Sequence, residues 1–235
     1  MDLAIAIAVI VVGSFVQTSI GFGLAVIAAP ILLFVDPLYV PAPITICAFT
    51  LSLVNAYKYR RSISFKGLQY AVVGRVPGTI IGGMLLWWID QQQLALLVGA
   101  SVLFAVALSL KNIVLQPTKI AMFSAGFLSG FFGTSSSIGG PPMALVLQHQ
   151  EGDFIRANLA AFFIVSCLMS LSMLSVVGQF GTAQLVVSLP LMPATLIGYW
   201  LAMKTLDLIS HQTLRNSSLC LCGIAGGAAI ISYWL

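Results

Sequence analysis

The chain has 235 residues, of which 60% are apolar and 7% are charged, with a formal net charge of +4 and a mean hydropathy of +1.06. Soluble domains carry about 25% charged residues, so this composition excludes an ordinary soluble protein. The apolar runs are long and continuous, and each approaches the roughly 20 residues that span a bilayer core. We predict an all-α polytopic membrane protein.

Apolar runs and helix breakers predict eight segments. The first covers about 3–35 with an interruption, and it lacks a basic n-region, so we expect a retained membrane segment. The remaining segments are predicted at about 41–57, 67–88, 94–112, 119–148, 154–175, 184–203 and 213–235, of which 119–148 is again interrupted. The connections are short, so one integral membrane domain is expected.

The two interruptions read "TSIGFG", Thr18 to Gly23, and "GTSSSIGGPP", Gly133 to Pro142. Irregular backbone at membrane depth is tolerated only where protein covers it or where it lines a wet cavity. Glycines permit positive φ and a close approach to the backbone, and Pro141 suits the first turn of a returning helix. Each interruption is therefore predicted to be the tip of a re-entrant hairpin, with arms of about 14 residues or roughly 21 Å.

Two short patterns recur at an offset of 116 residues and indicate an internal repeat, 1–115 and 116–235. The pattern F-x-x-T-S heads each half, and P-x-T-x-x-G follows later in each. The paired positions are Phe15, Thr18 and Ser19 with Phe131, Thr134 and Ser135, and Pro77, Thr79 and Gly82 with Pro193, Thr195 and Gly198. We predict helix kinks and close helix packing for the second pattern, with substrate contact as the alternative.

The basic residues predict the topology. Arg75 alone of the ten lies within a span, which leaves nine in loops. If both interrupted segments crossed the membrane, the nine would divide six and three between the faces. If both are re-entrant, all nine share one face, and the opposite loops carry Asp2, Asp36 and Asp90. Basic loops accumulate on the cytoplasmic side, so we predict re-entrant hairpins and both termini outside.

Each half then makes three net crossings, and the halves are inverted repeats. Broken helices in inverted repeats are common in secondary transporters. Helices that start near Gly23 and Gly140 would direct partial positive charge at one point, which suits an anion. The candidate binding residues are Gln17, Thr18, Ser19, Gly21, Gly23, Arg75, Thr134, Ser135, Ser136, Ser137, Gly139 and Gly140. For the small residues, close helix packing is the alternative.

Arg75 lies nine residues beyond Lys66, roughly 13 Å into its segment and near the middle of the bilayer. An arginine at that depth is costly and marks a functional candidate. It would contact the anion, or it would cap carbonyls at a hairpin tip. Leu191 occupies the equivalent position of the second half, so the site would be asymmetric. No Asp or Glu lies deep in a span, and proton coupling would depend on Glu151, Asp153, His149 or the substrate itself.

Other chemistry finds little support in the sequence. The four cysteines, Cys47, Cys167, Cys220 and Cys222, are interpreted as buried small hydrophobes. The two histidines have no metal-ligand spacing, so neither a metal nor a cofactor is expected. The run "YKYRRSISFK" fits a solvated cytoplasmic loop better than a patch for nucleic acid or lipid headgroups. An enzyme would need paired carboxylates, a metal cluster or a reactive cysteine near a tip.

The stretches "GSFVQTSIGFGLAVIAAPILLF" (Gly13 to Phe34) and "GFLSGFFGTSSSIGGPPMALVL" (Gly126 to Leu147) resemble the TauE/SafE family, also called the sulfite exporter or toluene-sulfonate uptake permease family. The resemblance covers essentially the whole chain. It implies transport of sulfite, sulfoacetate, isethionate or other small organosulfonates across a prokaryotic inner membrane. Many members carry consecutive glycines at both breaks, whereas this chain has Gly21-Phe22-Gly23 and a serine-rich second break.

We therefore expect a secondary transporter that holds its anion at the midplane and works by alternating access. An anion channel and a carrier of small carboxylates are the alternatives. A purely structural subunit leaves the repeated polar break unexplained.

Overall fold

The computed structural model describes residues 2–110, 115–205 and 211–234, which form helices joined by short connections and contain no strand. The elements are α1 (Asp2–Ile20), α2 (Leu24–Val35), η1 (Pro37–Tyr39), α3 (Ala42–Lys58), η2 (Arg60–Ser62), α4 (Leu68–Leu85), α5 (Gln91–Leu110), α6 (Lys119–Ser135), α7 (Gly140–Leu147), α8 (Gly152–Val176), α9 (Thr182–Ser188), α10 (Leu191–Thr205) and α11 (His211–Trp234). The predicted all-α fold is confirmed.

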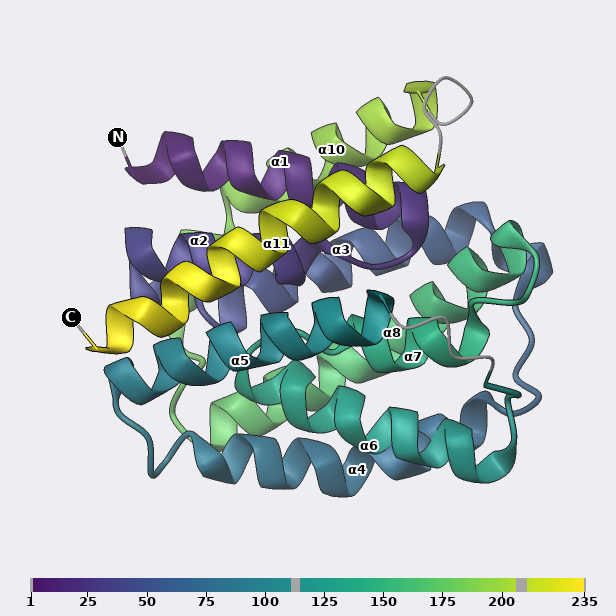
Figure 1. The fold of residues 1–235 in the computed structure, drawn as a ribbon, viewed down its shortest axis with the longest axis horizontal. Coiled ribbons are helices and arrows are strands. Elements are labelled where there is room, and N and C mark those ends of the chain that lie inside the picture. The colour runs from purple at the N-terminus through teal and green to yellow at the C-terminus, as the bar shows by residue number, and fades with distance from the viewer. Residues whose placement is uncertain (1, 111–114, 206–210, 235) are drawn as a thin grey trace.

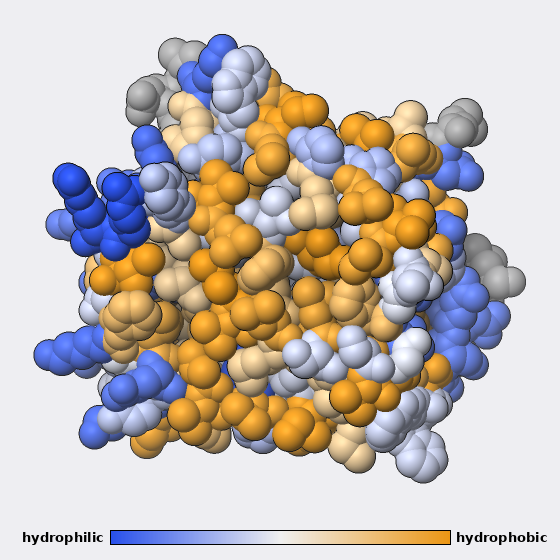
Figure 2. Space-filling view, turned by 180° about the vertical axis from the view of Figure 1, so that it is seen from behind, coloured by the Kyte–Doolittle hydropathy of each residue, from blue (hydrophilic) through white to orange (hydrophobic). Residues whose placement is uncertain are grey.

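Among the described residues, five segments are long and apolar enough to cross a membrane: Asp2–Ile20, Pro37–Lys58, Gln91–Leu110, Gly152–Val176 and Thr182–Thr205. Figure 2 shows apolar side chains in a continuous band between two hydrophilic ends. The outer faces of α4 and α10 expose large apolar side chains, including Val76, Ile80 and Ile197, that are not packed in the protein core. These features define a multi-pass membrane protein.

Both predicted interruptions are present, but they are shorter than expected and begin later in the chain. Thr18 and Ser19 remain in α1, and the non-helical residues are Gly21 to Gly23, with φ of 93° at Gly21 and 130° at Gly23. The Ser19 hydroxyl donates to the carbonyl oxygen of Phe15 at 2.9 Å, which is compatible with a continuing helix. The arm that precedes the break is therefore long.

The second break covers 136–139, because Thr134 and Ser135 continue α6. The arms of the two hairpins have 19 and 12 residues in α1 and α2, and 17 and 8 residues in α6 and α7. The prediction of equal arms was wrong. The single helix expected at 184–203 was also wrong, since α9 and α10 are separate. Pro190 between them has no N–H to donate to the helix ladder.

Each hairpin packs its long arm on a helix from the other half of the chain: α6 lies along α4, and α1 lies along α10 (Figure 1). Gly78 approaches the backbone of Phe127, and Gly82 approaches that of Phe131. At the equivalent contact in the other half, Gly198 approaches the carbonyl oxygen of Val11. This exchange supports the predicted inverted repeat, which stays a prediction together with the division at residues 115 and 116.

The two ends of the bundle differ in charge. The first residues of α1 and the last residues of α11 lie at one end (Figure 1). The opposite end, here called the basic end, holds the connections 59–67 and 148–151, the start of α6 and the end of α10. Seven of the nine loop cations belong to these segments or adjoin them. Arg60, Arg61, Lys66, Lys119 and Lys204 lie within them, Lys58 is the last residue of α3, and Arg156 lies in the second turn of α8. Lys111 lies outside the described residues, as does the side chain of Arg215.

Candidate functional site

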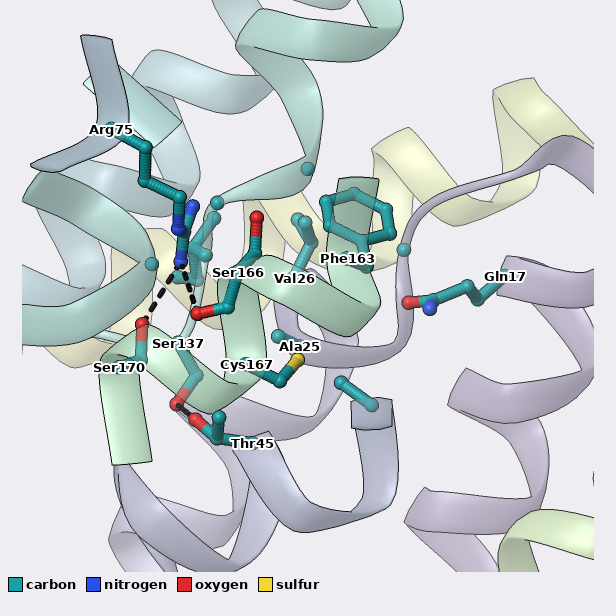
Figure 3. A pocket seen from close by; sticks show the side chains of 16 residues that line it. Gln17, Ala25, Val26, Thr45, Arg75, Ser137, Phe163, Ser166, Cys167 and Ser170 are labelled. Atoms are coloured by element: carbon teal, nitrogen blue, oxygen red, sulfur yellow. Dashed lines mark hydrogen bonds between the residues drawn. The ribbon is translucent and has the colours of Figure 1, made fainter. Parts of the chain in front are cut away.

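A central cavity of about 40 Å³ lies where the two breaks meet (Figure 3). A cavity needs roughly 10–15 Å³ to hold one water molecule, so this space suits a small ligand. Both hairpins, α3, α4 and α8 contribute its lining: Gln17, Gly23, Ala25, Val26, Thr45, Ala48, Arg75, Gly133, Ser137, Ile138, Gly139, Gly140, Phe163, Ser166, Cys167 and Ser170. The structure thus brings Arg75 and both predicted tips to one point.

Arg75 is the cation of this cavity. Its side chain extends from α4 and donates from Nη1 to Ser129 Oγ at 2.9 Å, and from Nη2 to Ser170 Oγ at 2.9 Å and to the Ser166 carbonyl oxygen at 3.2 Å. The residue is 3% exposed, and its Nε has no hydrogen-bond partner within the described part of the chain.

Arg75 forms no salt bridge with any described residue. The ion pair that the described chain does contain joins Arg156 to Asp153. A buried charge without a counter-ion is strongly unfavourable unless other groups compensate it. The hydroxyl and carbonyl partners of Arg75 supply dipoles but no negative charge. The arginine therefore lies in a setting in which a bound anion is stabilising.

The sequence left open that Arg75 caps backbone carbonyls at a hairpin tip. The hydrogen bonds of Arg75 fit this alternative only in part. Its one carbonyl partner belongs to Ser166 of α8 rather than to a break. Ser129 accepts from Arg75 and donates to the carbonyl oxygen of Gly139, so Arg75 reaches the second break through one hydroxyl. The guanidinium is thus positioned by α6 and α8.

The first break presents the N-terminus of α2. The Leu24 N–H donates to Gln17 Oε1 at 3.2 Å, so the side chain of Gln17 caps this helix. The next two N–H groups, of Ala25 and Val26, have no acceptor among the described residues, and both residues line the cavity. Orphan N–H groups at a helix start carry partial positive charge. Figure 3 shows Gln17 and Arg75 extending toward the pocket from opposite sides.

The second break is held by its own hydroxyl contacts. Ser137 has a φ of 64° and donates from Oγ to the carbonyl oxygen of Pro41 at 2.7 Å, with Thr45 Oγ1 at 3.4 Å. Pro141 and Pro142 occupy the first turn of α7 and carry no N–H. The start of α7 therefore offers fewer free N–H donors than the start of α2.

Several of the hydroxyl groups that the sequence predicted as ligand donors form hydrogen bonds within the protein instead. Ser135 and Ser136 donate to the carbonyl oxygens of Phe131 and Phe132, as Ser19 does to Phe15. Thr134 Oγ1 lies 2.8 Å from Ser170 Oγ, which also accepts from Arg75. None of these four side chains lines the central cavity. They fix the hairpins and, through Ser170, the arginine.

Two further hollows adjoin the first break. A small cavity of about 10 Å³ is lined by Gln17, Thr18, Gly21, Ser52, Asn55, Arg156, Ala160 and Phe163, and it shares Gln17 and Phe163 with the central cavity. A vestibule of about 440 Å³ is lined in part by Ser19, Phe22, Pro141, His149 and Arg156. Of the binding residues predicted from the sequence, Thr18 and Gly21 line the small cavity and Ser19 lines the vestibule, rather than the central cavity.

The residues of the P-x-T-x-x-G pattern lie outside the central lining. Pro77 is inside α4 without ending it, and Pro193 is in the first turn of α10. Thr195 donates to the carbonyl oxygen of Leu191 at 2.9 Å, whereas the buried Thr79 Oγ1 has no hydrogen-bond partner among the residues that the structure describes. Their positions favour packing over substrate contact.

The sequence reasoning missed α8 as a wall of the site. Ser166 and Ser170 are four residues apart, which places two hydroxyls on one face of an apolar helix. That spacing was the available signal. Cys167 beside them is buried, as are Cys47 and Cys222, but Cys220 is exposed and the prediction for it was wrong.

The fold and the cavity define a class of protein. It is an all-helical, multi-pass membrane protein that places a buried cation, with no counter-ion among the described residues, between two helix breaks. A family model described as sulfite exporter TauE/SafE matches residues 5–229, and the chain therefore belongs to this family. No curated protein and no solved structure matched the chain.

The variant Gln17→Glu separates binding from folding at this site. A carboxylate can still accept the Leu24 N–H and favours a helix start, so the melting temperature is expected to be unchanged or higher. Its negative charge at the cavity wall is expected to lower the affinity for sulfite about 10-fold or more, ~1.4 kcal/mol. Gln93→Glu is the matched control, because Gln93 accepts the Asp90 N–H at 3.1 Å and does not line the cavity. Equal sulfite affinity in both variants would contradict a binding role for this wall.

Proposed function

We propose that the chain is a secondary transporter, not an enzyme, for small sulfur-containing anions such as sulfite, sulfoacetate or isethionate. The observation that carries this proposal is Arg75, a buried cation that has no carboxylate partner among the described residues and lines a cavity beside the start of α2. Membership of the TauE/SafE family indicates the sulfur-anion class.

The cavity offers the contacts that a small oxyanion needs. Guanidinium groups form paired, charge-assisted hydrogen bonds with oxyanions, and Arg75 has Nε free while Nη1 and Nη2 are anchored on hydroxyls and a carbonyl. The free N–H groups of Ala25 and Val26 supply further donors. A sulfonate or sulfite has three oxygens to share among these groups. Ala48 and Phe163 complete the wall with apolar surface, which limits the size of the substrate.

Alternating access is supported by unequal openings at the two ends. At the basic end, the vestibule shares Arg156 with the small cavity, which in turn shares Gln17 and Phe163 with the central one. At the other end, a hollow of about 430 Å³ is lined by Asp36, Asp90 and their neighbours and shares no residue with the central cavity. We propose that this conformation is nearer to opening at the basic end.

The basic end is proposed to face the cytoplasm of a prokaryote, with both termini outside the inner membrane. The positive-inside rule supports this orientation, because the seven described loop cations share one end. The described spans bury no carboxylate beside the cavity, so coupling to protons or other ions is left to experiment.

Uptake into proteoliposomes tests the proposal. Purified protein is reconstituted, and uptake of sulfite, sulfoacetate, isethionate, taurine, sulfate and lactate is measured with and without the same anion trapped inside. We expect saturable uptake of the sulfur anions that trapped substrate accelerates. Uptake of lactate alone would overturn the sulfur-anion assignment. Non-saturating flux without counterflow would identify a channel.

A further inference from the structure

We propose that Arg156 forms a second, outer anion site, at which a small oxyanion binds on its way between the vestibule and Arg75. This inference rests on the proposed function. It assigns a chemical role to a residue that the sequence presents only as one of the loop cations.

The position of Arg156 is the first argument. It lies in the second turn of α8 and lines both the vestibule and the small cavity. The small cavity, at about 10 Å³, is continuous in its lining with the central cavity through Gln17 and Phe163. An anion that travels from the vestibule to Arg75 along these walls therefore passes the guanidinium of Arg156.

The contacts of Arg156 are the second argument. Its Nη2 donates to the carbonyl oxygen of Ser19 at 3.0 Å, in the last turn of α1. A helix C-terminus carries partial negative charge, so this contact anchors the cation and covers a surface that would repel an anion. Its Nη1 contacts Asp153 Oδ1 at 3.2 Å.

These contacts, to Ser19 and to Asp153, differ in how easily an anion can replace them. The side chain of Arg156 is 10% exposed, whereas that of Asp153 is 66% exposed. An ion pair with an exposed carboxylate contributes about 0–1 kcal/mol, so the carboxylate loses little when it returns to water. An oxyanion in the vestibule can take the place of Asp153 at Nη1 while the bond to Ser19 persists. The guanidinium then holds the substrate at the entrance of the narrow passage.

The surroundings of Arg156 favour an anion over a cation. His149 and Gln148 lie in the same vestibule lining, and the described lining contains no carboxylate. The Arg156 guanidinium lies 5.9 Å from the ring of Tyr59, in the connection after α3. Burial raises the pKa of the Tyr59 phenol, so this ring stays neutral and does not compete with a substrate anion. Asp153 is thus a negative charge that competes with a substrate anion for Arg156.

The test compares Arg156→Gln with Arg60→Gln in proteoliposomes. Arg60 is an exposed cation of the same end that lines none of these cavities, so the control removes equal charge. Initial rates of sulfite and sulfoacetate uptake are measured together with equilibrium binding in detergent. We expect Arg156→Gln to lower the uptake rate at low substrate at least 10-fold, with binding at the Arg75 site changed less than 3-fold. Arg60→Gln should behave like the wild type.

The variant Asp153→Asn provides a second test, because its uptake kinetics can be measured even if Arg156→Gln does not fold. Without the competing carboxylate, KM for uptake is expected to fall 2- to 5-fold while the maximal rate is kept. An unchanged KM in Asp153→Asn, or wild-type uptake by Arg156→Gln, overturns the outer site and leaves the transporter assignment intact. If the wild-type protein moves none of the anions, the proposed function fails and the outer site fails with it.

Discussion

Replacing Arg75 with glutamine is expected to lower the affinity for sulfite or sulfoacetate by at least about 100-fold, roughly 3 kcal/mol. Glutamine keeps a hydrogen-bond donor but removes the positive charge that no described residue neutralises. Calorimetric binding in detergent measures the loss. The fold should persist, because the substitution also removes the cost of burying a charge that no described residue neutralises.

Arg75→Lys is the conservative comparison. It keeps the charge but loses the fork that bonds Ser129, Ser166 and Ser170 at once, so we expect affinity between those of the wild type and Arg75→Gln. Thermal unfolding gives an independent reading. A ligand at 100 times its Kd adds about 2.7 kcal/mol of stability, and Arg75→Gln should lose this ligand-induced shift. A folded Arg75→Gln protein that still binds with wild-type affinity would falsify the contact and leave Arg75 a structural role.

Replacing Gly78 with alanine is expected to destabilise the bundle by about 3 kcal/mol or more. A Cβ at Gly78 would overlap the carbonyl oxygen of Phe127, which is helix backbone and does not move aside as a flexible side chain would. The contact lies between α4 and α6, the arm that leads to the second break. Small residues at such crossings allow two helices in a membrane to approach closely.

Gly223→Ala is the matched control, since a Cβ there meets nothing within 4 Å. Alanine is the better helix former, so Gly223→Ala is expected to be neutral or slightly stabilising. Melting temperature and the yield of monodisperse protein after detergent extraction measure both variants. Because α4 carries Arg75, a surviving fraction of Gly78→Ala should also bind sulfite more weakly. Equal melting temperatures for the two variants would show that α4 and α6 are not tightly packed at this point.

Much of the fold follows from patterns that are local in the sequence. Apolar runs predicted the helices, and the glycines at residues 21 and 23 predicted the first break. The limits of that break were wrong because Thr18 and Ser19 continue α1, where the Ser19 hydroxyl bonds back to the carbonyl oxygen of Phe15. Hydropathy does not distinguish a serine that opens a helix from one that bonds back to it.

The candidate site could be predicted in part. Arg75 was conspicuous because an arginine is rare at that depth, and the breaks were conspicuous because they are polar. Its partners were not, since Ser129, Ser166 and Ser170 lie 54, 91 and 95 residues away along the chain. Which hydroxyls face the cavity depends on how each helix is rotated about its axis.

The sequence by itself determined the membrane class, the two breaks and the separation of charge, because each depends on composition within a short stretch. The tertiary structure decided which residues meet: it placed Arg75 among the serines of α6 and α8, capped α2 with Gln17, and set Arg156 between two cavities. The physical reason is that these helices are apolar on nearly every face. Their pattern therefore carries little information on rotation, and close packing between distant segments, as at Gly78 and Phe127, fixes it instead.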